Sequence, residues 1–91
     1  MFVIISYDIQ NDRRRTKVHK CLKSFGQWVQ FSVFECELEK SDYLRLRDRL
    51  DRLLDKAAGD SVRFYFLCER CSPAVERIGG EPPLPTGAVF V

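Results

Sequence analysis

The chain has 91 residues, of which 45% are hydrophobic and 31% charged, and its formal net charge is +2. This length fits a single domain spanning 1–91 with a thin core, and the composition excludes an intrinsically disordered chain. No segment approaches the roughly 18–20 consecutive apolar residues of a membrane-spanning helix, so no membrane association is expected.

The positive charge is concentrated at the start of the chain. Residues 1–30 hold six lysines and arginines against two acids, a net +4, whereas residues 31–91 hold nine against eleven, a net −2. A basic first third on a nearly neutral chain predicts a local anionic partner such as nucleic acid. A solvated helix face is the alternative reading of the same charges.

The cellular location is predicted from the chain start and the cysteines. The apolar start is short, lacks a basic region before it and ends in an acid, so a secretory signal is not expected. The sequence therefore indicates a cytoplasmic protein with reduced thiols. Cys21 and Cys36 lie in apolar patterns and are expected in the core. Cys68 and Cys71 form a lone CxxC far from His19, the only histidine, which does not favour a zinc site or a disulfide.

The first half of the chain predicts a strand, a helix and further extended structure. Residues 2–7 are β-branched, aromatic and uncharged, which is typical of a buried strand. Asp12 is a suitable N-cap for a helix that runs to about Phe25 and stops at Gly26. The apolar positions of this helix share one face: Val18, Cys21, Leu22 and Phe25. Residues 28–38 are expected to form two strands or one bent strand.

The second half predicts another helix and two strands. Ser41 can cap a helix over 42–58, in which i, i+4 pairs such as Asp48 with Arg52 solvate the outer face. Its expected buried stripe is Tyr43, Leu46, Leu50, Leu53, Leu54 and Ala57. Residues 62–68 predict a strand that completes a core of residues 1–70. A Pro/Gly-rich connection over 71–87 and a short terminal strand over 88–91 follow.

The order β-α-β-β-α-β predicts an α+β ferredoxin-like fold, with two helices on one face of an antiparallel sheet and an extra C-terminal strand. The first strand is apolar on both faces, with Phe2 and Ile4 on one and Val3 and Ile5 on the other. Two helices cannot cover both faces, so a homodimer with its sheets packed face to face is predicted. The terminal strand could then dock on the partner's sheet edge.

Asp8, at the end of the first strand, is the candidate catalytic and metal-binding residue. A two-fold axis could bring two copies of Asp8 together, and Mg²⁺ often binds one or two carboxylates plus water and substrate phosphate. His19 and Ser32 lack an evident catalytic arrangement. Metal-assisted phosphodiester hydrolysis, with Mg²⁺ or another divalent cation such as Mn²⁺, is therefore the predicted chemistry.

Three arginines at the predicted helix start suggest a phosphate ligand. The helix dipole makes positive side chains mildly unfavourable there, and a bound phosphate would reverse that effect. The predicted nucleic-acid contacts are Arg13, Arg14, Arg15, Lys17 and Lys20. Such phosphate contacts position a nucleic acid without reading its sequence.

Three segments together resemble one known family. They are a strand ending in Tyr7-Asp8, a basic helix that ends at Gly26, and the strand "QFSVFE" over 30–35. This combination closely resembles the CRISPR-associated protein 2 family, the small adaptation subunit of prokaryotic adaptive immunity. The similarity extends through the second helix and the 62–68 strand.

The resemblance implies a ferredoxin-like homodimer in which Asp8 of both subunits flanks a divalent metal, usually Mg²⁺. It also implies two kinds of function. One is a metal-dependent endonuclease that acts on RNA or double-stranded DNA. The other is a scaffold that joins dimers of the CRISPR-associated protein 1 integrase and holds new spacer DNA during spacer acquisition. The scaffold needs the basic surface but not Asp8 chemistry.

Two other functions fit parts of the sequence. A toxin-like ribonuclease related to virulence-associated protein D would share the fold. A plain RNA-recognition module is disfavoured, because its Lys/Arg-Gly-Phe aromatic signature is missing.

Overall fold

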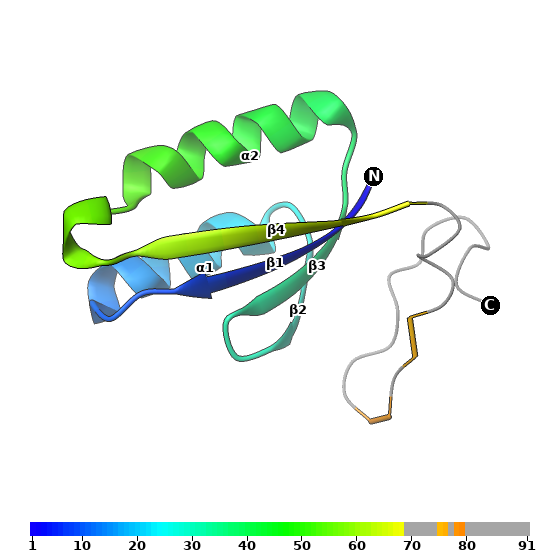
Figure 1. Cartoon of the computed structure of the whole chain (residues 1–91), viewed down its shortest axis with the longest axis horizontal. Coiled ribbons are helices and arrows are strands. Elements are labelled where there is room, and N and C mark those ends of the chain that lie inside the picture. The colour runs from blue at the N-terminus through cyan, green and yellow to red at the C-terminus, as the bar shows by residue number, and fades with distance from the viewer. Residues whose placement is uncertain (69–74, 77, 80–91) are drawn as a thin grey trace.

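A computed structural model describes residues 1–68, 75–76 and 78–79 of the chain. The elements follow in the order β1 (Phe2–Asp8), α1 (Asp12–Lys23), β2 (Gln27–Gln30), β3 (Val33–Glu37), α2 (Lys40–Leu53), a 3₁₀ turn η1 (Lys56–Ala58) and β4 (Ser61–Leu67). Figure 1 shows both helices running alongside the strands. None of the helices described is long and apolar enough to cross a membrane.

The four strands form one antiparallel sheet in the order β2-β3-β1-β4. One of the two inner strands is β1, where Ile5 lies opposite Phe34 of β3 on one side and Phe64 of β4 on the other. This order confirms the predicted ferredoxin-like α+β fold. The predicted terminal strand, 88–91, lies outside the described residues.

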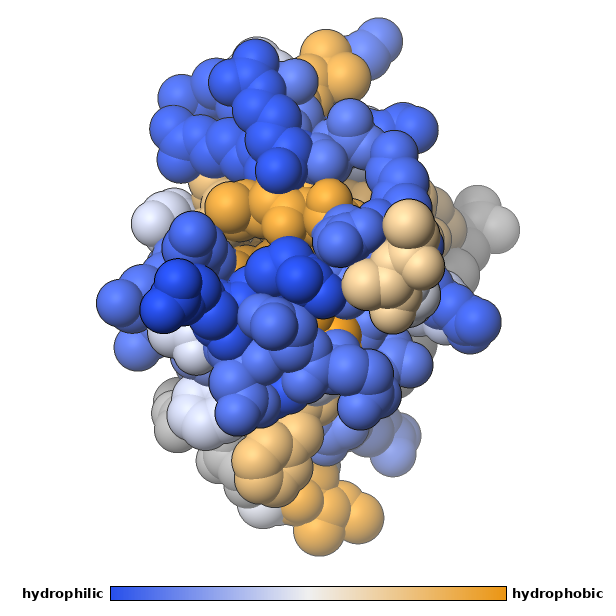
Figure 2. Space-filling model, turned by 90° about the vertical axis from the view of Figure 1, so that its left-hand side faces the viewer, coloured by the Kyte–Doolittle hydropathy of each residue, from blue (hydrophilic) through white to orange (hydrophobic). Residues whose placement is uncertain are grey.

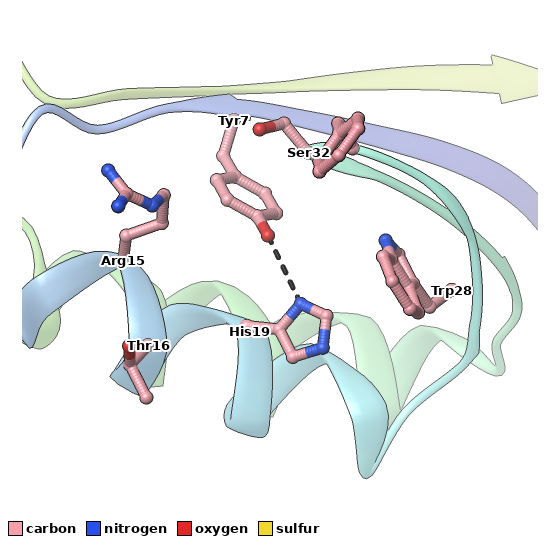
Figure 3. A pocket seen from close by; sticks show the side chains of 7 residues that line it. Tyr7, Arg15, Thr16, His19, Trp28 and Ser32 are labelled. Carbon is pink, nitrogen blue, oxygen red and sulfur yellow. Dashed lines mark hydrogen bonds between the residues drawn. The ribbon is translucent and has the colours of Figure 1, made fainter. Parts of the chain in front are cut away.

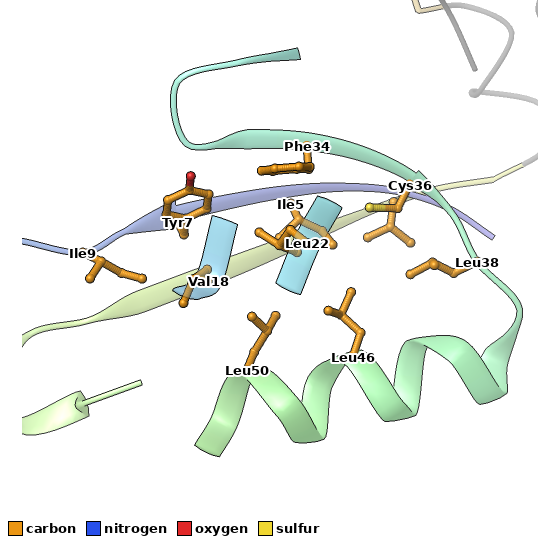
Figure 4. Packing of buried hydrophobic residues seen from close by; sticks show 11 residues of the cluster. Ile5, Tyr7, Ile9, Val18, Leu22, Phe34, Cys36, Leu38, Leu46 and Leu50 are labelled. Atoms are coloured by element: carbon orange, nitrogen blue, oxygen red, sulfur yellow. The ribbon is translucent and has the colours of Figure 1, made fainter. Parts of the chain in front are cut away.

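Both helices pack on the same face of the sheet, and the core lies between the helices and the sheet (Figure 4). The strands contribute alternate residues, because side chains along a strand point to opposite faces. The buried cluster contains Val3, Ile5, Tyr7, Ile9, Val18, Leu22, Phe34, Cys36, Leu38, Leu46 and Leu50. The predicted helix faces are thus confirmed at Val18, Leu22, Leu46 and Leu50, and Cys21 and Tyr43 pack at the edge of the cluster.

The predicted ends of the first helix were wrong by a few residues. The N-cap is Asn11 rather than Asp12, because the Asn11 side chain accepts a hydrogen bond from the Arg14 backbone at 2.9 Å. The helix ends at Lys23, two residues before the predicted Phe25. The Gly26 N–H still donates to the Leu22 carbonyl at 2.9 Å, so Gly26 satisfies the helix end as expected.

The second helix also begins and ends earlier than predicted. It starts at Lys40, and the N-cap position is Glu39, without a side-chain hydrogen bond, instead of Ser41. The chain leaves the helix after Leu53, and Asp55 caps the separate turn η1, so Ala57 is exposed and not part of the buried stripe. The predicted extended segment 28–38 is two strands, joined by a turn in which Ser32 has a φ of 59°.

The sheet face opposite the helices carries Phe2, Ile4, Ser6 and Asp8 of β1. Phe2 is buried and Ile4 partly buried, whereas Tyr65, opposite Ile4 on β4, is 48% exposed. This face therefore combines apolar side chains with the strand-end carboxylate of Asp8, and its packing against a partner stays a prediction.

A candidate metal ligand and nucleic-acid interface

Asp8 is the last residue of β1 and is exposed. Its neighbour Tyr7 points into the helix-covered core, so Asp8 lies on the opposite face of the sheet. In the strand register Asp8 stands opposite Ser61, the first residue of β4. The carboxylate is therefore held at the end of a paired strand, with solvent access for a ligand.

One chain supplies only part of a metal site. No group of three or more His, Cys, Asp or Glu side chains that could hold a metal occurs among the residues described. An exposed carboxylate is a suitable oxygen ligand for Mg²⁺, which commonly takes one or two carboxylates and completes its coordination with water and phosphate. Asp8 thus fits one half of a shared site, and metal binding there stays a prediction.

Arg14 joins the start of α1 to the start of β4. Its guanidinium donates two hydrogen bonds to Asp60, from Nε at 2.7 Å and from an Nη at 3.3 Å. The Asp60 side chain is only 1% exposed and also accepts from the Asp55 backbone at 2.9 Å. The hydrogen bond from Arg14, aided by the Asp55 N–H, lowers the pKa of Asp60. Since Ser61 follows Asp60, this pair fixes the strand end opposite Asp8.

Arg15 holds the turn between β1 and α1. One Nη donates to the Ile9 carbonyl at 3.0 Å, and the other pairs with Asp12. These contacts explain how the helix start accommodates Arg14 and Arg15: both guanidinium groups face acids or carbonyl oxygens of the same chain. Phosphate binding by Arg14 and Arg15 stays a prediction, and each already has intramolecular partners.

The other predicted phosphate contacts lie along one side of α1. Arg13, Lys17 and Lys20 are all exposed and follow i, i+4, i+7 spacing, which places them on one face of the helix. Figure 2 looks at the end of the molecule where α1 begins and β1 ends, and hydrophilic residues cover most of it. We call Arg13, Lys17 and Lys20 the cationic row. Phosphate binding by these three side chains stays a prediction.

A pocket that the sequence did not predict lies between α1 and the β2–β3 turn (Figure 3). The Tyr7 hydroxyl is 3.2 Å from Nδ1 of His19, and the His19 ring meets the Trp28 ring edge-on at 5.2 Å. Burial lowers the pKa of His19, and the charge of Lys23 lowers it further. His19, for which the sequence indicates no catalytic arrangement, therefore favours its neutral form and contacts residues of β1 and β2 from its place on α1.

The fold and these surfaces together define a small ferredoxin-like protein with a basic helix and a strand-end carboxylate. Residues 1–75 match the family model described as CRISPR associated protein Cas2. The chain belongs to this family.

Curated relatives agree over nearly the whole chain. A Chloroflexus aurantiacus protein named CRISPR-associated endoribonuclease Cas2 1 is 49% identical over 83 residues, covering 91% of this chain and 89% of the relative. A Synechocystis protein named CRISPR-associated endoribonuclease Cas2 3 is 48% identical over 90 residues, covering 97% and 96%.

Solved structures share the fold. Streptococcus pyogenes Cas2 superposes with a TM-score of 0.75 at 33% identity, covering 87% of this chain and all of that one. A chain in a structure described as a partial Cas6-RT-Cas1–Cas2 complex superposes with a TM-score of 0.72 at 29% identity, with 97% of both chains covered.

Proposed function

We propose that the chain acts in CRISPR adaptation as a nucleic-acid-binding homodimer with metal-dependent endonuclease activity, RNA being its first expected substrate. The curated relatives carry the name endoribonuclease, which supports nuclease chemistry. The observation that carries the proposal is the placement of Asp8: an exposed carboxylate at the end of the inner strand β1, on the sheet face that the helices leave uncovered.

The homodimer part rests on the chemistry of that uncovered face. Tyr65 is half exposed there, and Ile4 and Leu67 are only partly covered. In addition, the buried side-chain oxygen of Gln27, opposite Glu35 in the register, has no hydrogen-bond partner within the described part of the chain. A second sheet packed on this face would remove apolar surface from water, and its two-fold axis could bring the Asp8 residues together.

The two Asp8 carboxylates would hold the divalent cation, Mg²⁺ or Mn²⁺. When bound, such a cation polarises a phosphodiester and makes a coordinated water more acidic. The residues of the chain contribute position: Arg14 and Asp60 fix β4 beside Asp8, and the cationic row, Arg13, Lys17 and Lys20, holds phosphates along the strand.

A second function is a structural scaffold for spacer DNA and an integrase partner. It is favoured by the similarity to a chain from a structure described as a partial Cas6-RT-Cas1–Cas2 complex. For this role the cationic row would bind duplex backbone, and the CRISPR-associated protein 1 integrase would be the protein partner. Duplex binding would then be independent of Asp8.

The variant Asp8→Asn separates these functions. We expect it to lose Mg²⁺- or Mn²⁺-dependent cleavage of single-stranded RNA while it retains duplex binding. Light scattering should still give about twice the chain mass of 10.6 kDa. The matched control is Asp48→Asn, which removes another exposed carboxylate, on α2, where Asp48 pairs with Arg52 at 3.0 Å. The control should cleave RNA at the wild-type rate.

Cleavage by Asp8→Asn at the wild-type rate, in a preparation free of contaminating nuclease, would refute the catalytic role. Absence of cleavage in the wild-type protein with intact duplex binding would leave the scaffold function alone. A mass equal to one chain at micromolar concentration would refute the shared site.

A further inference from the structure

A cavity of about 220 Å³ lies between α1 and the β2–β3 turn. Tyr7, Arg15, His19, Trp28 and Ser32 are among its lining residues, and Figure 3 shows the Tyr7 hydroxyl pointing at the His19 ring, with Trp28 on one side and Arg15 on the other. Because Tyr7 and Asp8 are consecutive strand residues, this cavity and the Asp8 carboxylate lie on opposite faces of the sheet. The cavity is therefore separate from the proposed metal site.

The cavity has two aromatic rings available to a ligand. Trp28 is 44% exposed although its ring contacts His19, so a ligand can still reach this residue. Phe31 also lines the cavity and is 91% exposed. The adjacent Ser32 has a φ of 59°, a left-handed conformation that is unusual for a non-glycine residue and sets the shape of this turn. A large apolar ring left in water at a formed cavity indicates a binding surface.

The polar groups of the cavity are mostly neutral, and its positive charges lie beside them. The Tyr7 hydroxyl and the His19 ring form a hydrogen-bonded pair, and the lowered pKa of His19 leaves that ring uncharged near neutral pH. Arg15 lines one side, and Lys23 is close enough to His19 to act on its charge. A ligand that suits this cavity would have a flat, uncharged, hydrogen-bonding ring for the neutral side chains and an anionic group for the positive charge beside them.

We propose that this cavity binds one unpaired nucleotide of an RNA strand, with its base against Phe31 and Trp28 and its phosphate toward the exposed Lys23. Aromatic side chains stack on bases of single strands, whereas the base faces of a duplex are hidden. The proposal deepens the nucleic-acid-binding function proposed above and rests on it. It adds a preference for single-stranded or extruded nucleotides at a place other than the cationic row.

The test uses Trp28, the only tryptophan of the chain, as its own fluorescent probe. Asp8→Asn protein in EDTA is titrated with a short oligoribonucleotide, and separately with a blunt duplex of the same sequence. The single strand should quench Trp28 saturably and the duplex should not. Phe31→Ala should weaken single-strand binding about 5- to 150-fold, the range for loss of one stacking partner. Phe31→Tyr should restore it.

The matched control is Leu44→Ala, which removes a side chain that is also exposed, on α2. If Phe31→Ala and Leu44→Ala bound the single strand with equal affinity, the nucleotide-binding cavity would be refuted. The proposed duplex binding and cleavage would not be refuted by that result. A change of mass by light scattering in Phe31→Ala would also overturn it, because the ring would then belong to a protein interface. Failure of the wild-type protein to bind any nucleic acid would reject the underlying function instead.

Discussion

The cationic row offers the sharpest measurement of how this protein holds nucleic acid. Arg13, Lys17 and Lys20 are exposed on one side of α1, whereas Arg14 and Arg15 are engaged with acids and carbonyl oxygens. We therefore expect that changing Arg13, Lys17 and Lys20 together to glutamine removes the phosphate contacts and leaves the fold intact.

The salt dependence of duplex binding gives the magnitude. Each phosphate contact with duplex DNA contributes about 0.9 to the slope of log affinity against log salt concentration. Three lost contacts should lower the slope by about 2.7 for each protomer that touches the duplex. Between about 50 and 200 mM salt, the wild-type protein should then lose about 40-fold more affinity per protomer than the variant. Fluorescence anisotropy of a labelled blunt duplex over a salt series measures this.

A control with equal charge removal decides whether position matters. Lys40, Arg52 and Lys56 are exposed on α2 and η1, and changing them to glutamine lowers the net charge by the same amount. That variant should keep the wild-type slope. If both triple variants changed the slope equally, the effect would be one of overall charge, and the assignment of α1 as the contact surface would be refuted.

Two further predictions concern the structure around the site. Since the hydrogen bond from Arg14 lowers the pKa of Asp60, its carboxylate stabilises the fold above about pH 4, and this is lost as the pH falls through the lowered pKa. The Tm difference between the wild type and Asp60→Asn should therefore shrink on acidification; a constant difference would contradict the ion pair. Gly26→Ala should destabilise the chain by about 1–3 kcal/mol in urea unfolding, because the added Cβ would lie 2.6 Å from the Glu35 carbonyl oxygen and closer still to Cys36 Sγ. In a background that carries Cys36→Ala, Gly26→Ala should still lower the stability, because the Glu35 carbonyl oxygen remains in the way of the added Cβ. If Gly26→Ala cost no stability in that background, the clash with the backbone would be refuted.

The strands and helices were predictable because each is encoded by local periodicity. The short, uncharged apolar run of β1 and the apolar spacing of Val18 and Leu22 both appear directly in the structure. The ends of the helices were harder to predict. Asn11 and Asp12 are equally suitable N-caps, and only the backbone path selects Asn11. Similarly, Leu53 and Leu54 continue an apolar pattern although the helix stops between them.

The site was predictable only where its residues are consecutive. Asp8 at the end of an apolar run and the row of basic residues after it can be seen in the sequence. The Arg14–Asp60 pair joins residues 46 positions apart, and nothing in the local pattern of either residue selects the other. The cavity at Tyr7, His19 and Trp28 draws one residue from each of three elements, so its existence depends on how α1 packs against the sheet.

The end of β1 connects both proposals while keeping them physically apart. Tyr7 faces the helices and forms the wall of the aromatic cavity, whereas Asp8 faces the uncovered side where a second protomer would pack. The sheet separates the two groups, so a nucleotide in the cavity cannot be the group that reacts at Asp8 of the same strand end. The cavity would therefore act by holding a strand beside the cationic row of α1, and Phe31 and Asp8 should contribute independently to binding and to cleavage.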